Sequence, residues 1–396
     1  MPELSSRAAN MPASPLRKLA NAAEDRKKAG TKVYHLNIGQ PDMTTPEEFF
    51  EGLKSINTCP IEYAMSQGAA EAIDAWREYY AGIDINLDKD ELMITTGGSE
   101  ALIFAFCSVA DPGDNIIVFE PFYTNYNGFG QIGGVEMKPV TCSIEDGFHL
   151  PADEVVEAAI DDKTRAMIIC NPSNPTGTVY SKEELKRMVD LAIKHNLFII
   201  ADEVYREFGF EEDVTSLMLF PEAADRVILV DSASKRFNAC GIRIGILASH
   251  NKDIVTASVK YGMARLSVAT IEQMALIPVL KKWDELIPPV VEEYRKRRDV
   301  VYEGLIAIEG VKTSKPEGAF YIVCELPVDS SENFAQWMIE EFEHEGETVL
   351  VAPAPGFYAT PGMGEKEIRI AYVLNCEDLQ RALELLKLAI EQYNSK

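Results

Sequence analysis

The chain has 396 residues, of which 46% are hydrophobic and 26% are charged, a composition typical of globular proteins. Its 38 lysines and arginines stand against 63 aspartates and glutamates, a formal net charge of −25 that argues against binding of a nucleic-acid backbone. The amino terminus lacks the apolar core of a secretory signal, and no run approaches the roughly 18 uncharged apolar residues of a membrane helix.

The cysteine pattern argues against a metal site. The seven cysteines are widely spaced, and the sequence contains neither a Cys-x-x-Cys pair nor an HExxH motif. We expect free thiols in a reducing cytoplasm and no bound metal.

Short apolar runs alternate with amphipathic helices from about residue 90 to residue 290. The runs are continuous rather than alternating, which is typical of strands covered on both faces. Between two of them, Ser181 and Glu184 form the capping box of a helix, so the unit is strand–helix–strand. Repetition of this unit predicts an α/β fold with a mostly parallel sheet. The expected strands are 115–121, 165–172, 197–203, 226–232 and 242–249.

The pattern changes after about residue 290. A long helix is expected first, then strands at 318–326 and 366–373, and a closing helix at 377–393. These elements predict a smaller α+β region. The basic run 295–298 lies within the long helix, and we interpret it as a solvated face rather than a nucleic-acid patch.

Two glycine-rich segments are candidate ligand-binding loops. Gly128, Gly130 and Gly133 match the dinucleotide fingerprint, but the fingerprint requires a strand before it and a helix after it, and here a strand follows instead. The segment 95–99 is better placed, because it leads directly into an apolar helix whose first N–H groups can bind an anion. A plain tight turn explains the second segment equally well.

Several polar residues follow the carboxyl ends of expected strands, where open α/β sheets bind ligands. Lys235 is among them, and Arg243 follows it by eight residues. Taken alone, the two could be a loop cation and a salt-bridge partner. Together with an anion site, a pocket lysine that can attack a carbonyl and an acid for a ring nitrogen describe pyridoxal phosphate. The residues in question are Asn174, Asp202, Tyr205, Ser232, Ser234 and Lys235.

The chain resembles the class I aminotransferases of the aspartate aminotransferase-like superfamily, which are fold-type I pyridoxal-phosphate enzymes. The motifs that carry the resemblance span nearly the whole chain in family order: NIGQPDMTTP, YAMSQGAAEAIDAW, TTGGSEAL, EPFYTNY, NPSNPTG, ADEVY, SASKRFNACGIRIG, PEGAFYIV and IRIAYV. The resemblance implies a seven-stranded-type sheet in a large domain, residues 46–290, and a small domain of residues 1–45 and 291–396 with an amino-terminal arm.

The resemblance also implies the catalytic and cofactor-binding residues. Lys235 would bond to the cofactor and carry the substrate α-proton, Asp202 would face the pyridine nitrogen, and Tyr205 and Asn174 would hold the phenolate oxygen. Tyr123, also a substrate contact, would stack on the ring, with Val204 on the opposite face. The phosphate would be bound by Gly98, Ser99, Ser232, Ser234 and Arg243.

The substrate and subunit contacts follow from the same resemblance. Arg369 would clamp the substrate α-carboxylate with help from Gly39 and Asn174. Tyr63 would reach the phosphate of a neighbouring subunit, which implies a homodimer with shared sites. Ser99 stands where one bacterial branch has a lysine for the distal carboxylate. We hypothesise that Arg265 reads that group across the dimer, while a structural salt bridge explains it equally well.

The expected activity is transfer of an amino group from an acidic or aromatic L-amino acid to a 2-oxo acid, 2-oxoglutarate being the expected acceptor, in two half-reactions. Cleavage of a carbon–sulfur bond on the same fold is the nearest alternative. A noncatalytic, cofactor-holding protein and a nicotinamide oxidoreductase are the alternatives from other classes, and the latter rests only on the glycine motif at 128–133.

Overall fold

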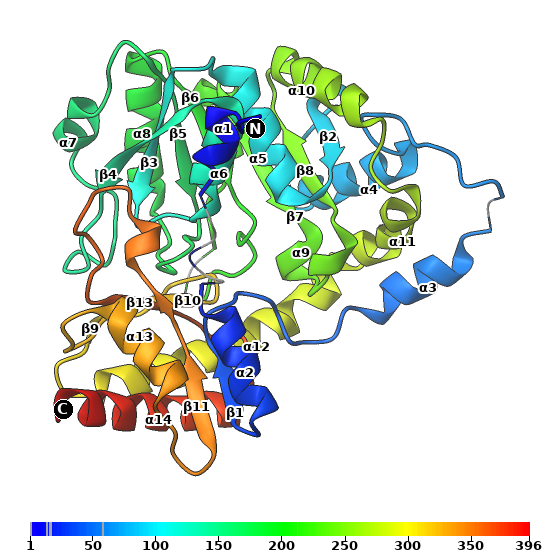
Figure 1. The fold of residues 1–396 in the computed structure, drawn as a ribbon. Helices are drawn as coiled ribbons and strands as arrows, with labels where there is room; N and C mark the ends of the chain where they lie inside the picture. The colour runs from blue at the N-terminus through cyan, green and yellow to red at the C-terminus, as the bar shows by residue number, and fades with distance from the viewer. Residues whose placement is uncertain (1, 13–14, 16–17, 58, 212) are drawn as a thin grey trace.

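The computed structural model describes residues 2–12, 15, 18–57, 59–211 and 213–396, and its centre is a seven-stranded sheet (Figure 1). The strand order is β2-β8-β7-β6-β5-β3-β4. The sheet is parallel except for β8, which runs antiparallel to both of its neighbours. The expected mostly parallel α/β fold is therefore confirmed, with the run at 242–249 as its reversed strand. The strands are β2 (Leu92–Thr95), β3 (Asn115–Glu120), β4 (Glu136–Thr141), β5 (Thr164–Cys170), β6 (Phe198–Asp202), β7 (Val227–Ser232) and β8 (Gly245–Ala248).

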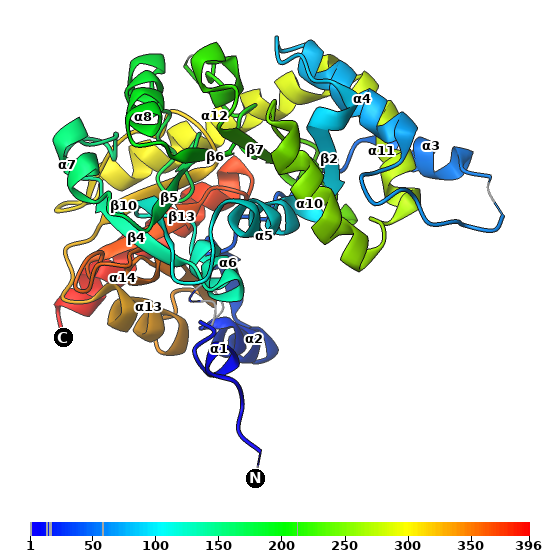
Figure 2. The ribbon, with the colours of Figure 1, turned by 90° about the horizontal axis from the view of Figure 1, so that it is seen from above.

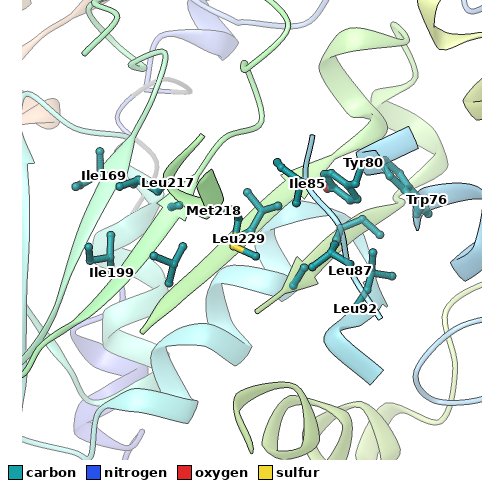
Figure 3. Packing of buried hydrophobic residues seen from close by; sticks show 14 of the residues in the cluster. Trp76, Tyr80, Ile85, Leu87, Leu92, Ile169, Ile199, Leu217, Met218 and Leu229 are labelled. Carbon is teal, nitrogen blue, oxygen red and sulfur yellow. The ribbon is translucent and has the colours of Figure 1, made fainter. Parts of the chain in front are cut away.

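Helices cover both faces of this sheet, which explains why its inner strands are apolar at successive positions. In Figure 2, α5 (Gly97–Val109), α6 (Asn125–Gly133) and α10 (Lys252–Arg265) lie on one side of the strands. The other side carries α3 (Glu47–Ser55), α4 (Ala70–Ala81), α7 (Asp153–Ala158), α8 (Lys182–Lys194) and α11 (Thr270–Lys281). Figure 3 shows this second layer, where Trp76 and Tyr80 of α4 lie in one buried cluster with Leu229 of β7.

A second group of elements forms the lower part of the view in Figure 1. A four-stranded antiparallel sheet has the order β12-β13-β10-β9, and β1 pairs with β11 in parallel. The strands are β1 (Lys32–His35), β9 (Lys312–Thr313), β10 (Tyr321–Glu325), β11 (Glu347–Leu350), β12 (Ala352–Pro353) and β13 (Glu367–Ala371). The helices are α2 (Ala20–Lys28), α13 (Ser331–Glu340) and α14 (Cys376–Asn394), while α1 (Ser6–Ala9) belongs to the amino-terminal arm.

One long helix, α12 (Trp283–Ile306), joins the two groups. Ile287, near its start, packs in the cluster under the large sheet, whereas Val301 and Leu305 pack in the cluster of the second group. We propose that the two clusters correspond to the domains expected at 46–290 and at 1–45 with 291–396. That division falls inside α12, beside Pro288 and Pro289, rather than in a loop.

The basic run of α12 differs from the sequence-based expectation. Arg295 and Lys296 are exposed, but Arg297 and Arg298 are buried. Arg297 binds Asp42 at 2.7 Å, and Arg298 donates to the carbonyl of Pro316 at 2.7 Å. The interpretation as a solvated face is therefore wrong for these two arginines, because their helix positions turn them towards the loops that they bind.

The glycine motif at 128–133 forms most of α6, which is a helix and not a phosphate loop. A β-carbon on Gly130 would lie 2.6 Å from the carbonyl oxygen of Val135, so the glycine permits close packing of helix against chain. The nicotinamide alternative thereby loses its supporting motif.

Candidate active site

A cavity of about 330 Å³ lies at the carboxyl edge of the large sheet and is lined by residues of both groups of elements. All the residues expected at the site line it except Tyr63 and Arg265. The expected lining residues are Gly39, Gly98, Ser99, Tyr123, Asn174, Asp202, Val204, Tyr205, Ser232, Ser234, Lys235, Arg243 and Arg369; Ile38, Gln40, Leu102, Asn125, Cys170, Cys240 and Tyr321 complete the set.

Lys235 enters the cavity from α9 (Ala233–Arg236), a single helical turn that follows β7 directly. Ser232 caps this turn, since its side chain accepts a hydrogen bond from the N–H of Ser234. The Lys235 Nζ donates to the carbonyl oxygen of Gly39 at 2.9 Å. A primary amine is thus held at the cavity wall by one neutral acceptor.

Asp202 ends β6 and is buried at the floor of the cavity. Its Oδ2 accepts a hydrogen bond of 2.6 Å from the hydroxyl of Tyr126, whereas its buried Oδ1 has no partner among the described residues. Burial raises the pKa of this carboxyl to about 6, and the bond from Tyr126 opposes the rise. An unpaired buried acceptor is costly, so the site suits a ligand that brings an N–H donor.

An anion cradle lies beside the start of α5. This helix has no side-chain cap at its amino end, and its first residues, Gly97 and Gly98, leave the backbone open. The Arg243 guanidinium lies so close that a β-carbon on Gly97 would be 2.4 Å from Nη2. With the hydroxyls of Ser232 and Ser234, which are 2.8 Å apart, these groups offer the donors that a phosphate needs.

Arg369 is buried on β13 and forms no ion pair with any acid of the described residues. Its Nη1 donates to the Asn174 side chain at 3.2 Å, and its Nη2 donates to the carbonyl of Asn37 at 2.6 Å. The rings of Tyr321 and Phe357 lie 4.6 and 5.0 Å from the guanidinium carbon, and Nε has no partner in the described chain. A buried cation without an acidic partner suits a carboxylate ligand.

Tyr321 is the main cavity residue that the sequence did not reveal. Its hydroxyl lies 2.8 Å from that of Tyr205, and a β-carbon on Gly39 would come within 1.9 Å of it. The sequence gives no signal for this role, because Tyr321 lies in a continuous apolar run. Asn125 was also missed; it donates to the hydroxyl of Tyr123 at 2.7 Å, while burial raises the pKa of Tyr123 to about 12.

Behind the cavity lies a buried ion cluster made of sequence neighbours of the site residues. Glu203, Arg206, Asp231 and Arg236 adjoin Asp202, Tyr205, Ser232 and Lys235 in the chain, and all four are buried. Arg236 pairs with Asp231 and with the hydroxyl of Tyr79, and Arg206 binds the same hydroxyl at 2.6 Å. The cluster thus anchors the far side of the strand ends that carry the site.

Replacing Arg236 with methionine is expected to lower the free energy of unfolding by about 3–5 kcal/mol, because the buried Asp231 would lose its closest cation and keep only Arg206, at 3.6 Å. Chemical denaturation measures the change. Arg295→Met is the matched control on α12, where an exposed pair with Glu292 is lost, and it should change stability by less than about 0.5 kcal/mol. Equal effects of the two changes would contradict this account of the cluster.

The two expected residues outside the cavity have different surroundings. Tyr63 has 80% of its surface exposed. Arg265 pairs with Glu100 at 3.2 Å and donates to the carbonyls of Ser66 and Ile94 at 3.2 and 3.1 Å. Of the two explanations for Arg265, the structure shows the salt bridge.

Over the part of the chain that the structure describes, no helix is long and apolar enough to cross a membrane. Within the same described ranges, no three histidine, cysteine or acidic side chains are grouped as a metal site would require.

The chain is similar to known proteins over most of its length. The family model for aminotransferase class I and II matches residues 31–386. A putative aminotransferase, YugH, from Bacillus subtilis is 32% identical over 90% of this chain and 91% of its own. The aspartate/prephenate aminotransferase of Thermus thermophilus is 31% identical over 92% of each chain.

Solved structures give the same result. The aspartate aminotransferase from Thermus thermophilus with maleate has a TM-score of 0.90 at 29% identity and covers 98% of this chain and all of its own. The alanine aminotransferase from Pyrococcus furiosus has the same TM-score at 27% identity, with coverage of 98% and 100%. The match over most of the length shows that this chain belongs to the class I and II aminotransferases and is an aminotransferase.

Proposed function

We propose that the chain binds pyridoxal phosphate in the 330 Å³ cavity and moves the amino group of an L-amino acid to 2-oxoglutarate. The observation that carries the proposal is the convergence on one cavity of three ionisable groups that form no ion pair with the described residues. An amine at Lys235, an orphan carboxylate oxygen at Asp202 and a guanidinium without an acid at Arg369 together match an aldehyde, a ring nitrogen and a carboxylate.

The residues present fit this cofactor. Asp202 would hold the ring nitrogen, and Tyr205 with Asn174 would hold the phenolate oxygen. Tyr123 and Val204 would contact the two faces of the ring. The cradle of Gly98, Ser99, Ser232, Ser234 and Arg243 would bind the phosphate. When bound, the cofactor supplies an electron sink for the bond broken at the substrate α-carbon.

The chain's own contribution is to bind, orient and move a proton. Arg369 would bind the α-carboxylate through its guanidinium, with Gly39 and Asn174 beside it. The Nζ of Lys235, at the cavity wall, would take the substrate α-proton and hold it for its return. Asp202 would keep its negative charge against the ring nitrogen throughout. The positions of these three groups around one cavity support this division of labour.

An acidic amino-acid donor would require a fourth cation near the cavity, to bind its side-chain carboxylate. Among the described lining residues, the cations are Lys235, Arg243 and Arg369, and the proposal assigns a partner to each. Arg265 is occupied by Glu100 and by backbone carbonyls. An acidic donor would therefore need a cation from a second copy, whereas an aromatic donor would not.

We further propose a homodimer with shared sites in the cytoplasm. The segment that follows α3 exposes Ile61, Tyr63 and Met65 by 60%, 80% and 76%, and Figure 1 shows it extending from the side of the molecule. Tyr63 would reach the phosphate bound by the other copy. Light scattering should give twice the chain mass of 44.0 kDa; a monomer would contradict the shared site.

The test of function is the visible absorbance of the cofactor-loaded protein while single amino acids are added. A spectral change with aspartate or glutamate, and regeneration by 2-oxoglutarate, supports transamination of an acidic donor. A change with aromatic or neutral amino acids alone excludes the distal-carboxylate hypothesis, as would unchanged aspartate and glutamate half-reactions in Arg265→Ala. Pyruvate and ammonia formed without an oxo acid would identify the carbon–sulfur lyase instead.

A further inference from the structure

A buried carboxylate at the end of β3 is used by none of the steps above. Glu120 ends β3, has no exposed surface and forms no ion pair with any described cation. Burial of a carboxylate is costly unless strong hydrogen bonds compensate for the lost hydration. Its partners therefore indicate what it does.

The partners of Glu120 are mainly backbone groups of a distant loop. Its Oε2 accepts hydrogen bonds from the N–H groups of Ala359 and Thr360 at 2.8 and 3.1 Å, and its Oε1 accepts one from Thr141 at 2.7 Å. Two residues further on, the N–H of Phe122 donates to the carbonyl of Phe357 at 2.8 Å. The end of β3 thus holds the loop 357–360 at both ends.

This loop contacts the proposed substrate clamp. The Phe357 ring lies 5.0 Å from the guanidinium carbon of Arg369 and is fully buried. Asn174 and the carbonyl of Asn37 fix the two terminal nitrogens of the same guanidinium. A displaced Phe357 ring would leave that side of the guanidinium without contact, because in a close-packed core no neighbouring side chain is free to take its place.

We infer that Glu120 is a positioning residue for Arg369: it fixes the loop 357–360, and through the Phe357 ring it holds the guanidinium in the orientation that binds the substrate carboxylate. The inference rests on the proposed function of Arg369. Glu120 itself does not line the cavity, and its hydrogen-bond partners Thr141, Ala359 and Thr360 are not proposed cofactor residues. Its loss should therefore weaken carboxylate binding without weakening cofactor binding.

The experiment compares Glu120→Ala with Glu120→Gln in the cofactor-loaded protein. Glu120→Ala is expected to raise KM for the amino acid and for the oxo acid about tenfold, with kcat within about threefold. The dissociation constant of a carboxylic acid that has the donor's side chain but no amino group should rise equally. Glutamine keeps an acceptor for both N–H groups and should restore all three constants to within about threefold.

Controls separate this role from a merely structural one. Thr141→Val removes the third bond to Glu120 without touching the loop, and it should leave KM unchanged. The affinity for pyridoxal phosphate should not change in any Glu120 variant. A folded Glu120→Ala protein with an unchanged KM would overturn the inference, and so would a glutamine variant as impaired as alanine.

Two more variants cover the remaining outcomes. If Glu120→Ala does not fold, Phe357→Leu tests the same contact at its other end and should raise KM in the same way; no rise would overturn the inference. Arg369→Lys tests the proposed function separately. If it leaves KM unchanged, the carboxylate clamp itself is wrong, whereas a rise there without a rise in Glu120→Ala refutes only the role of Glu120.

Discussion

Replacing Lys235 with alanine is expected to lower the rate of each half-reaction by at least about 10³-fold, because covalent attachment and proton transfer are lost together. Its Nζ is the one primary amine in the described cavity lining. Single-turnover absorbance measures the rates. Reduction with borohydride should fix the cofactor permanently to Lys235. Mass spectrometry should then find it on the peptide that contains Lys235 in the wild type and not in the variant.

Lys252→Ala is the matched control for this change. Lys252 is exposed and pairs with Asp88 and Asp90 on the surface, so its loss should leave the rates unchanged. Retention of activity within tenfold in Lys235→Ala would show that another group performs the proton transfer, and the proposed role of Lys235 would fall.

The second large effect is expected for Asp202→Asn, which keeps the shape of the side chain and removes its charge. Loss of one preorganised electrostatic partner in a buried site costs about 10²- to 10³-fold in kcat. Tyr126→Phe is the control, since it removes the 2.6 Å hydrogen bond but leaves the carboxylate, and kcat should stay within about tenfold. Equal losses in the two variants would show that the hydroxyl, not the charge, is required.

The raised pKa of Asp202 adds a pH test of the same residue. Without the cofactor, the folded protein binds the proton of Asp202 more tightly than the unfolded chain does. The free energy of unfolding therefore falls as pH rises from about 4 to about 6. A cationic ring nitrogen would offset that loss only where the carboxylate is charged. The gain in melting temperature on adding pyridoxal phosphate should thus shrink below pH 6 in the wild type but not in Asp202→Asn.

The sequence was informative wherever a residue's role depends on its place along a strand. Lys235, Asp202 and Asn174 follow apolar runs, and parallel strands bring such residues to one edge whatever the side-chain packing. A strand–helix–strand unit of about 30 residues can be recognised in a single sequence. Strand placement thus accounts for the residues at the sheet edge, whereas the other site residues and the individual roles follow from the family resemblance. The residues at the edge are Asn174, Asp202, Tyr205, Ser232, Ser234 and Lys235.

The residues that the sequence did not reveal have roles that arise only from packing. Tyr126 reaches Asp202 because α6 lies against the sheet, and Tyr321 reaches Tyr205 across two groups of elements. The prediction of a solvated face was wrong for Arg297 and Arg298 for a related reason. A run of four basic residues on a helix points in several directions, and the composition does not say which of them meet an acid or a carbonyl.

The reversed direction of β8 explains why Lys235 and Arg243, the two cations of the proposed cofactor site, are only eight residues apart. Since β8 pairs antiparallel with β7, with Ser232 opposite Gly245, the chain leaves and re-enters the sheet at the same edge. A parallel β8 would begin at the far edge and carry Arg243 away from Lys235. The antiparallel pairing therefore keeps both cations at the same edge of the sheet. Residues inserted between 236 and 242 would lengthen the connection while both cations stay at their strand ends.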